Sequence, residues 1–337
     1  MLLFRHVSLR SDVAFNTMFN IMFSYRIHEK RLAQHVRSLS VVLDPRQPGC
    51  LHALSFACAV SQFPNLSELD ITLYPPPNPC PLTKRQGEPF FALEDEVLSI
   101  LRSGPRITAL RLANWSSDTS ILGTLLSLYH RTLRTLSLRG TPASFAAPPV
   151  SPLLSTPPCP LALTLEPSLA LAPVLINWLT DPNTAPLVRT LEFTRQPESA
   201  VLAGLLAAHG ATLTALALPA LTAANAAAVA AHDCSRLEAL RTEHPYTALP
   251  PRPLRARLRH VALAAAPALA LVREEARVRG CLESMSVMLW RGDEEEREMV
   301  GVLKVLCAQL GVRPEFERDV VAFRARFWAA CAVEPLV

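Results

Sequence analysis

The sequence predicts an α/β solenoid, in which each repeat adds one strand to a parallel concave sheet and one helix to an outer layer. Three observations support this prediction. A short apolar motif recurs along the chain, a helical segment lies between most of its copies, and 337 residues are more than one compact core usually holds. Hydrophobic residues make up 50% of the chain and charged residues 18%, which excludes a wholly disordered protein.

The recurring motif has the form apolar-x-x-apolar-x-apolar. Its copies are Phe4/Val7/Leu9, Val36/Leu39/Val41, Leu66/Leu69/Ile71, Ile107/Leu110/Leu112, Leu133/Leu136/Leu138, Val188/Leu191/Phe193, Leu213/Leu216/Leu218, Leu258/Val261/Leu263 and Leu282/Met285/Val287, with weaker copies at Pro160/Leu163/Leu165 and Leu237/Leu240/Thr242. The last positions alternate as in a strand with one buried face. Most copies begin at intervals typical of leucine-rich repeats, about 20–29 residues, so we expect a leucine-rich-repeat-like horseshoe. An ordinary α/β domain with leucine-rich strands is the alternative.

Helical segments separate most of the predicted strands. Apolar residues recur at helical spacing in residues 93–102, 118–129, 197–209 and 267–279. The segment 197–209 begins with Pro-Glu-Ser and ends before Gly210, a residue type common just after a helix. Alternation of strand and helix at this spacing predicts parallel strands with the helices outside, and stacking of neighbouring repeats stabilises each of them.

The repeats depart from the leucine-rich pattern at one position. That pattern places Asn or Cys three residues after the last leucine of each strand, where the asparagines form a ladder along the solenoid. Here the position holds Trp115, Thr141, Gln196 and Leu221. We therefore expect no asparagine ladder and an irregular curvature.

A change of pattern near residue 292 predicts two parts, a solenoid over residues 1–291 and a C-terminal helical cap over residues 292–337. The segment 293–310 opens with an acidic run that suits a helix N-terminus. The segment 314–331 places four apolar residues on one side of a second helix: Phe316, Val320, Phe323 and Phe327. We expect these two helices to close the open end of the solenoid.

The repeats, with openings such as FRHVSLRS (residues 4–11) and HVRSLSV (residues 35–41), resemble the repeat region of fungal, basidiomycete-type F-box proteins with degenerate leucine-rich repeats. In that family a helical F-box module precedes the repeats and docks the Skp adaptor of a cullin-RING ubiquitin ligase, and the repeats hold the substrate. This chain begins at the first predicted strand and shows no Leu-Pro-x-Glu-like F-box opening. The resemblance therefore implies a substrate-recognition module, which binds a Skp-type adaptor only if an F-box is encoded upstream.

The residue between the last two apolar positions of each motif is expected to face the concave side of the sheet. Most residues in this column are small or hydroxylated. The charged ones among and beside them are the candidate partner-binding residues: Asp70, Arg111, Arg139, Glu192 and Arg241. We expect them to contact a polar segment of an unknown protein partner. The alternative is a solvated face on which Asp70 and Arg111 pair across adjacent strands, worth only about 0–1 kcal/mol.

Three proline-rich segments each follow a predicted strand and should emerge on the same rim of the solenoid: residues 74–89, 141–160 and 243–257. Insertions on one edge often mark the binding edge of a solenoid, and tolerated irregular loops are the alternative. The third segment leads into a basic stretch, Arg252, Arg255, Arg257, Arg259 and His260. This stretch is expected to meet an acidic partner or a phosphate, and a solvated strand edge is the alternative.

Motifs for catalysis, cofactors and metals are absent from the sequence. It contains no G-x-S-x-G, H-E-x-x-H, G-x-x-x-x-G-K-[ST] or G-x-G-x-x-G. The only close set of histidine, acid and cysteine is His232-Asp233-Cys234, whose adjacent side chains should point in different directions. We therefore predict a protein-interaction module that is not an enzyme and has no cofactor or metal site. A structural scaffold unrelated to ubiquitin ligation is the alternative.

Charge, cysteine usage and hydropathy predict an intracellular protein, cytoplasmic or nuclear. The net charge of +4 is too small to indicate nucleic acid, and the eight cysteines form no C-x-x-C pair, as is usual for reduced core residues. Residues 199–232 contain no Lys, Arg, Asp or Glu. Interruptions at Gly210 and Pro219 and a high alanine content argue against a membrane span there.

Overall fold

The computed structural model describes residues 5–23, 32–75, 93–116, 120–140, 161–166, 173–181, 187–248, 258–274 and 281–331. The chain forms two compact units, Met1–Pro186 and Leu187–Val337. The predicted boundary at residue 292 falls inside the second unit.

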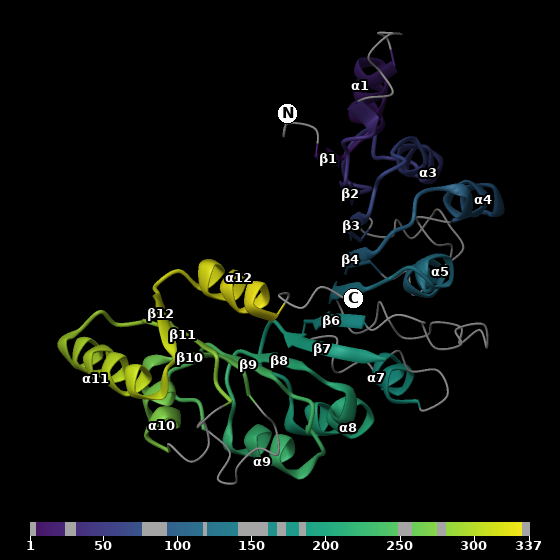
Figure 1. The fold of residues 1–337 in the computed structure, drawn as a ribbon. Coiled ribbons are helices and arrows are strands. Elements are labelled where there is room, and N and C mark those ends of the chain that lie inside the picture. The colour runs from purple at the N-terminus through teal and green to yellow at the C-terminus, as the bar shows by residue number, and fades with distance from the viewer. Residues whose placement is uncertain are drawn as a thin grey trace. The chain divides into compact units, whose positions relative to one another are not determined.

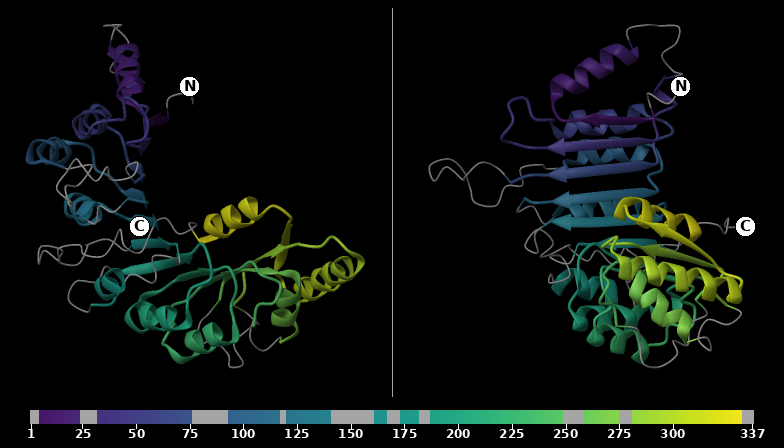
Figure 2. Two further views of the ribbon diagram at one scale, coloured as in Figure 1. Left: turned by 180° about the vertical axis from the view of Figure 1, so that it is seen from behind. Right: turned by 90° about the vertical axis from the view of Figure 1, so that its left-hand side faces the viewer.

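The first unit is a parallel sheet whose strands follow one another in sequence order, with helices in the connections between them (Figure 1, Figure 2). Its strands are β1 (His6–Leu9), β2 (Ser38–Leu43), β3 (Glu68–Leu73), β4 (Ala109–Asn114), β5 (Thr135–Gly140) and β6 (Leu161–Leu165). Its helices are α1 (Asp12–Phe23), α3 (Ala53–Gln62), α4 (Asp95–Ser103), α5 (Ser120–Tyr129) and α7 (Pro173–Thr180).

The second unit repeats this arrangement and is also a parallel sheet in sequence order. Its strands are β7 (Val188–Phe193), β8 (Ala215–Leu218), β9 (Ala239–Thr242), β10 (His260–Ala264), β11 (Ser284–Met288) and β12 (Arg313–Glu317). Its helices are α8 (Ser199–His209), a short 3₁₀ turn (Gly210–Thr212), α9 (Ala223–Ala231), α10 (Ala265–Arg273), α11 (Glu294–Leu310) and α12 (Val320–Cys331).

Every copy of the predicted motif places its last two apolar positions on a strand, from β1 to β11 in order. The strands pair in parallel within each unit and alternate with helices, which confirms the predicted α/β class and its repeated architecture. The curvature of a leucine-rich-repeat horseshoe stays a prediction.

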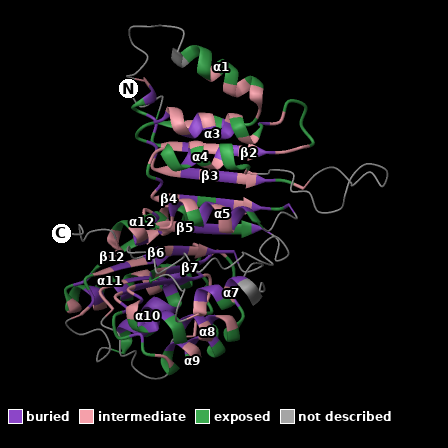
Figure 3. Ribbon diagram, turned by 90° about the vertical axis from the view of Figure 1, so that its right-hand side faces the viewer, coloured by how far each residue is buried: buried purple, intermediate pink, exposed green. Residues whose placement is uncertain are grey.

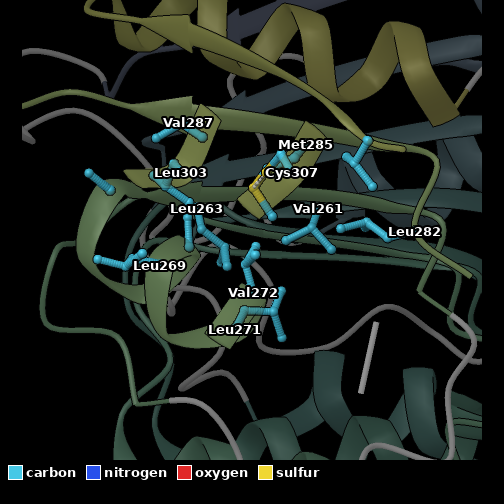
Figure 4. Packing of buried hydrophobic residues seen from close by; sticks show 13 residues of the cluster. Val261, Leu263, Leu269, Leu271, Val272, Leu282, Met285, Val287, Leu303 and Cys307 are labelled. Atoms are coloured by element: carbon cyan, nitrogen blue, oxygen red, sulfur yellow. Dashed lines mark hydrogen bonds between the residues drawn. The ribbon is translucent and has the colours of Figure 1, made fainter. Parts of the chain in front are cut away.

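Alternating burial along the strands shows where the main core lies. In β2 and β3 every second residue is buried, because one face of the sheet packs on the helices. In the second unit Val261, Leu263 and Met285 lie on one face of the sheet, in a core with Leu303 and Cys307 of α11 (Figure 4). Each repeat therefore buries its apolar pair against its own helix layer and the neighbouring repeats.

Hydroxyl groups link successive repeats on the side where the strands begin. In the first unit Thr132 Oγ1 donates to the carbonyl oxygen of Ile107 at 2.7 Å, and in the second Thr212 Oγ1 donates to that of Val188 at 3.0 Å. Further bonds of this kind come from Ser67, Thr108 and Thr214. Serine and threonine thus provide several of the side-chain bonds between repeats, and Asn65 Nδ2 adds another to the carbonyl oxygen of Gln34 at 2.9 Å.

Among the four positions named above where leucine-rich repeats carry asparagine, Gln196 makes a comparable bond. Gln196 Oε1 accepts from the backbone N–H of Ala220 at 3.0 Å, which connects two repeats. Trp115 is 37% exposed and Leu221 is fully buried, and Thr141 lies outside the described residues. Within the described chain, serine and threonine bonds therefore outnumber the side-chain bonds observed at these four positions.

The prediction of one helix over residues 314–331 is wrong in its first part. Residues Arg313–Glu317 form β12, which pairs in parallel with β11, and α12 begins only at Val320. Pro314 stands where β11 has Met285, which hides the apolar motif. Proline is compatible with this strand because β12 is an edge strand among the described residues, so one side of it needs no partner.

Helix α1 differs from the other helices in its burial. Its sequence is almost uncharged, yet none of its residues 12–21 is buried, and Figure 3 shows it as exposed or intermediate throughout its coloured part. Val13 is 69% exposed and Ile21 is 56% exposed. The apolar composition of α1 is therefore not explained by packing within the described chain.

At Gly140, at the end of β5, the backbones of β4 and β5 approach each other closely. Gly140 has a φ of +139°, and a Cβ placed there would lie 1.9 Å from the backbone oxygen of Asn114 in β4. We expect Gly140→Ala to lower the free energy of unfolding by about 2–3 kcal/mol, because both backbone strain and a strand-to-strand clash result. Chemical denaturation measures this change.

Gly204→Ala in α8 is the matched control. A Cβ at Gly204 has no atom within 4 Å, and alanine favours a helix. We expect it to be neutral or to stabilise the chain by up to about 1 kcal/mol. A Gly140→Ala protein as stable as Gly204→Ala would contradict the close approach of β4 and β5.

Candidate functional site

The sheet of the first unit has a second face that points away from its apolar core. Strand register places one row of side chains across this face: Ser8, Ser40, Asp70, Arg111, Ser137 and Thr164. This row is the first part of the column predicted to face the concave side. A second row, two residues further along the strands, consists of Val42, Thr72, Ala113 and Arg139.

Three of the predicted binding residues meet in one hollow on this face. Asp70, Arg111 and Arg139 line a cavity of about 310 Å³ together with Thr72, Leu112, Ala113 and Ser137. Arg111 and Arg139 are exposed, and Asp70 is partly exposed. Within the described part of the chain, no ion pair or hydrogen bond engages any of these three charged side chains. The Asp70–Arg111 pair, given above as the alternative, is therefore not formed, and the hollow offers three available charges.

The corresponding face of the second unit is covered by α12. All residues of β8 and β9 are buried, whereas β2 and β3 alternate. Phe323 and Phe327 of α12 pack on Ala215, Ala217, Ala239, Ala262 and Met288. Strand side chains alternate, so these floor residues lie on the face opposite Val261 and Leu263. The second helix of the predicted cap thus lies on a sheet face.

The other two predicted binding residues, Glu192 and Arg241, form an ion pair beneath this helix. Arg241 Nη2 donates to Glu192 Oε1 at 2.6 Å, although Ala217 of β8 stands between them in the register. The small Ala217 side chain allows the long arginine to cross a whole strand. Arg241 is only 1% exposed. Its observed partners therefore all belong to the chain itself.

Glu243 and Arg324 extend this ion pair onto α12. Nε and Nη2 of Arg324 donate to the Glu243 carboxylate at 2.6 and 2.7 Å, a bidentate contact. This contact raises the pKa of the Arg324 guanidinium. Arg241 Nε lies 3.3 Å from Glu243 Oε1, but the geometry is not that of a hydrogen bond. Glu243 therefore connects the sheet to α12 by charge.

Arg241 is left with unsatisfied donors. Its Nε and Nη1 have no hydrogen-bond partner among the described residues, and its Cζ lies 5.5 Å from the Phe327 ring centre and 5.6 Å from that of Trp328. The rings attract the cation, but a buried donor without an acceptor typically destabilises a protein by about 1–3 kcal/mol. With α12 packed over it, Arg241 therefore keeps two buried N–H groups that lack a hydrogen-bond acceptor among the described residues.

The acidic run at residue 293 forms the helix N-terminus predicted for it. Asp293 Oδ1 accepts from the backbone N–H of Glu296 at 2.8 Å, and the buried Glu296 carboxylate accepts from Gly292 N–H at 2.6 Å. Trp290 also donates its backbone N–H to Glu296, and its indole Nε1 donates to the carbonyl oxygen of Glu243 at 2.7 Å. Through Trp290, these bonds connect the start of α11 to Glu243, the residue that follows β9.

Part of the predicted basic stretch is neutralised within the sheet. Arg259 Nε donates to Glu283 at 2.8 Å, and its Nη1 lies 3.5 Å from Glu238. Burial outweighs these neighbouring acids and lowers the pKa of His260. The remaining arginines, at 252, 255 and 257, lie outside the described residues, as does most of each proline-rich segment.

The His232-Asp233-Cys234 set does not show the features of an activated nucleophile. Cys234 is buried, and burial raises the pKa of its thiol to about 11. The thiol is therefore protonated at neutral pH. The described ranges also contain no group of three or more His, Cys, Asp or Glu side chains placed to hold a metal ion.

None of the helices in the described parts combines the length and the apolar character that a membrane span requires. No protein-family model matches the chain, and no curated protein is significantly similar to it. The resemblance to F-box proteins stays a prediction.

Several residues that shape the covered face were not predicted as site residues: Glu243, Arg324 and Trp328. A sequence signal for the covering exists, however. The face column consists of hydroxyl and charged residues in β2–β5, whereas in the second unit it also contains Ala217 and Ala262. Alanine on a sheet face leaves room for a helix, and Phe323 and Phe327 lie four residues apart, on one side of a helix.

The contact of Phe327 with the alanine floor can be tested directly. Phe327 is 2% exposed. We expect Phe327→Ala to weaken the packing of α12 by about 3 kcal/mol, the lower end of the range for buried phenylalanine, because α12 can detach without unfolding the sheet. Hydrogen exchange should accelerate in α12 and remain unchanged in β10 and β11.

Val321→Ala on the same helix is the control, because Val321 is 74% exposed. It should leave the exchange of α12 within about twofold of the unsubstituted chain. Equal exchange rates for the two variants would show that α12 is not held through Phe327.

Proposed function

We propose that this chain is a protein-binding repeat protein, and that the first unit binds a polar segment of a protein partner on the open face of β3–β5. The hollow carries this proposal, because its Asp70, Arg111 and Arg139 have no hydrogen-bond or ion-pair partner among the described residues. In the second unit the equivalent column is engaged by a helix of the same chain. Of the two sheet faces, the open one in the first unit is therefore the better candidate for a partner.

The charges in the hollow define the chemistry of the segment. Arg111 is opposite Ser137 in the register and Arg139 is opposite Ala113, so the two arginines are diagonal neighbours on adjacent strands, roughly 8 Å apart at Cα. A carboxylate between them can accept hydrogen bonds from both guanidinium groups. Asp70 on β3 favours a basic residue of the partner. The segment we propose therefore carries an acidic and a basic side chain within reach of neighbouring strands.

The resemblance to fungal F-box proteins suggests a more specific form of this proposal. In this form the chain is the substrate-recognition part of an F-box-type ubiquitin ligase receptor, and it acts in the cytoplasm or nucleus. A Skp-type adaptor would bind an F-box module encoded upstream of residue 1. Co-purification of cullin-ligase subunits with the chain extended by the upstream coding sequence, if such sequence exists, would support this form.

Charge reversal in the hollow tests partner binding. Affinity purification with the full chain as bait, followed by quantitative mass spectrometry, gives the recovery of each bound protein. The double variant Arg111→Glu and Arg139→Glu should lower the recovery of a specific partner at least tenfold, about 1.4 kcal/mol, because desolvated charge pairs at an interface contribute at least this much. Direct titration of that partner then gives the affinity change.

Arg102→Glu is the matched control, because Arg102 is exposed on α4, in the helical layer of the same unit. This variant should recover the partner at the level of the unsubstituted chain. Equal recovery with the hollow variant and with Arg102→Glu would refute binding through the hollow and favour a structural scaffold.

A further inference from the structure

Helix α12 occupies a prepared surface on the second unit. The floor beneath it consists of small residues, with Met288 as its one large member: Ala215, Ala217, Ala239 and Ala262. Phe323 and Phe327, one helical turn apart, lie on this floor and are 0% and 2% exposed. Figure 1 and Figure 2 show α12 on the other side of the strands from α10 and α11. The floor cluster is also separate from the main core of the unit.

Arg241 lies in this surface and requires an acceptor that α12 does not provide. Its Nη2 is bonded to Glu192 and its Nε lies 3.3 Å from Glu243 Oε1, but neither Nε nor Nη1 has a hydrogen-bond partner among the described residues. The rings of Phe327 and Trp328 lie over the guanidinium. Cys331, one turn beyond Phe327, packs against the same cluster. Burial raises the pKa of Cys331 to about 12, so this thiol is neutral at physiological pH and supplies no negative charge.

We infer that the face of β8–β11 is a docking surface for a helical segment of a protein partner that carries two aromatic residues four apart and a carboxylate four residues beyond the second. In α12 these positions are Phe323, Phe327 and Cys331. The carboxylate of the partner satisfies the free donors of Arg241. Helix α12 then acts as an intramolecular competitor that lacks the acid.

Shape and charge both support this occupant. The alanine floor accommodates aromatic side chains at the spacing that α12 already shows, which is the spacing of one helix face. A buried guanidinium with two free donors strongly favours a carboxylate over a neutral group. The inference concerns the second unit alone and does not depend on the proposed function of the first.

The first experiment measures peptide binding to the full chain carrying Phe323→Ala and Phe327→Ala, which weaken the hold of α12. Two fluorescein-labelled peptides span residues 319–331, one with Cys331→Glu and one with Cys331→Gln. Fluorescence anisotropy should show at least tenfold tighter binding of the glutamate peptide. Adding Arg241→Gln to the chain should abolish this preference.

The unsubstituted chain should bind both peptides at least tenfold more weakly than the variant, because tethered α12 has an effective concentration in the millimolar range. Equal affinity of the variant for the two peptides would overturn the inference. So would a glutamate preference that survives Arg241→Gln.

A second experiment applies even if the double variant fails to fold. Full chains with Cys331→Glu and Cys331→Gln differ only in the charge placed near Arg241. Hydrogen exchange in α12 should be at least tenfold slower with glutamate than with glutamine. Equal or faster exchange with glutamate would overturn the inference. So would sedimentation that shows concentration-dependent dimers of the unsubstituted chain, because the surface would then belong to α12 of a second copy.

Discussion

Parallel pairing in register is the constraint on which the other features of this protein depend. Within each unit, the apolar pair of one strand lies beside that of the next, as Leu69 lies beside Leu110 and Leu216 beside Leu240. A shift by one residue would move every apolar side chain to the other face. Within each unit, the same register aligns the residues between the two apolar positions of each strand into a column. The pairing that forms the core therefore also builds the opposite face of the sheet.

The two units use that opposite face differently, and small differences in side-chain size decide how. In the first unit the column contains Asp70 and Arg111, whose charged groups remain available in an open hollow. In the second, alanines lower the surface enough for a helix to lie on it, and Arg241 reaches Glu192 across Ala217. An arginine without the helix above it would be solvated. Beneath the helix the buried guanidinium of Arg241 favours a ligand that brings a carboxylate.

Local sequence patterns made most of the fold predictable. The errors occur where contacts between distant segments determine the structure. Alternating apolar residues identified eleven strands, including β6 and β9, because the pattern depends on burial of one face. Pro314 concealed β12, since an edge strand tolerates a residue that an interior strand excludes. For the site, residue positions on the face were predictable from the period of two. The covering of Arg241 was not predicted, because the alanines on this face indicate room for a helix but not which helix packs there.

The hydroxyl bonds between repeats have a consequence for how such a chain can change. They act just before the strands begin, and they join residues separated by as few as 24 and as many as 41 positions. The spacing between strands is therefore set by contact at one edge and not by the length of the connection. Residues inserted after a strand lie at the opposite edge of the sheet and leave the next strand in place. The connections that follow the strands are therefore free to diverge in length and composition while the stack is preserved.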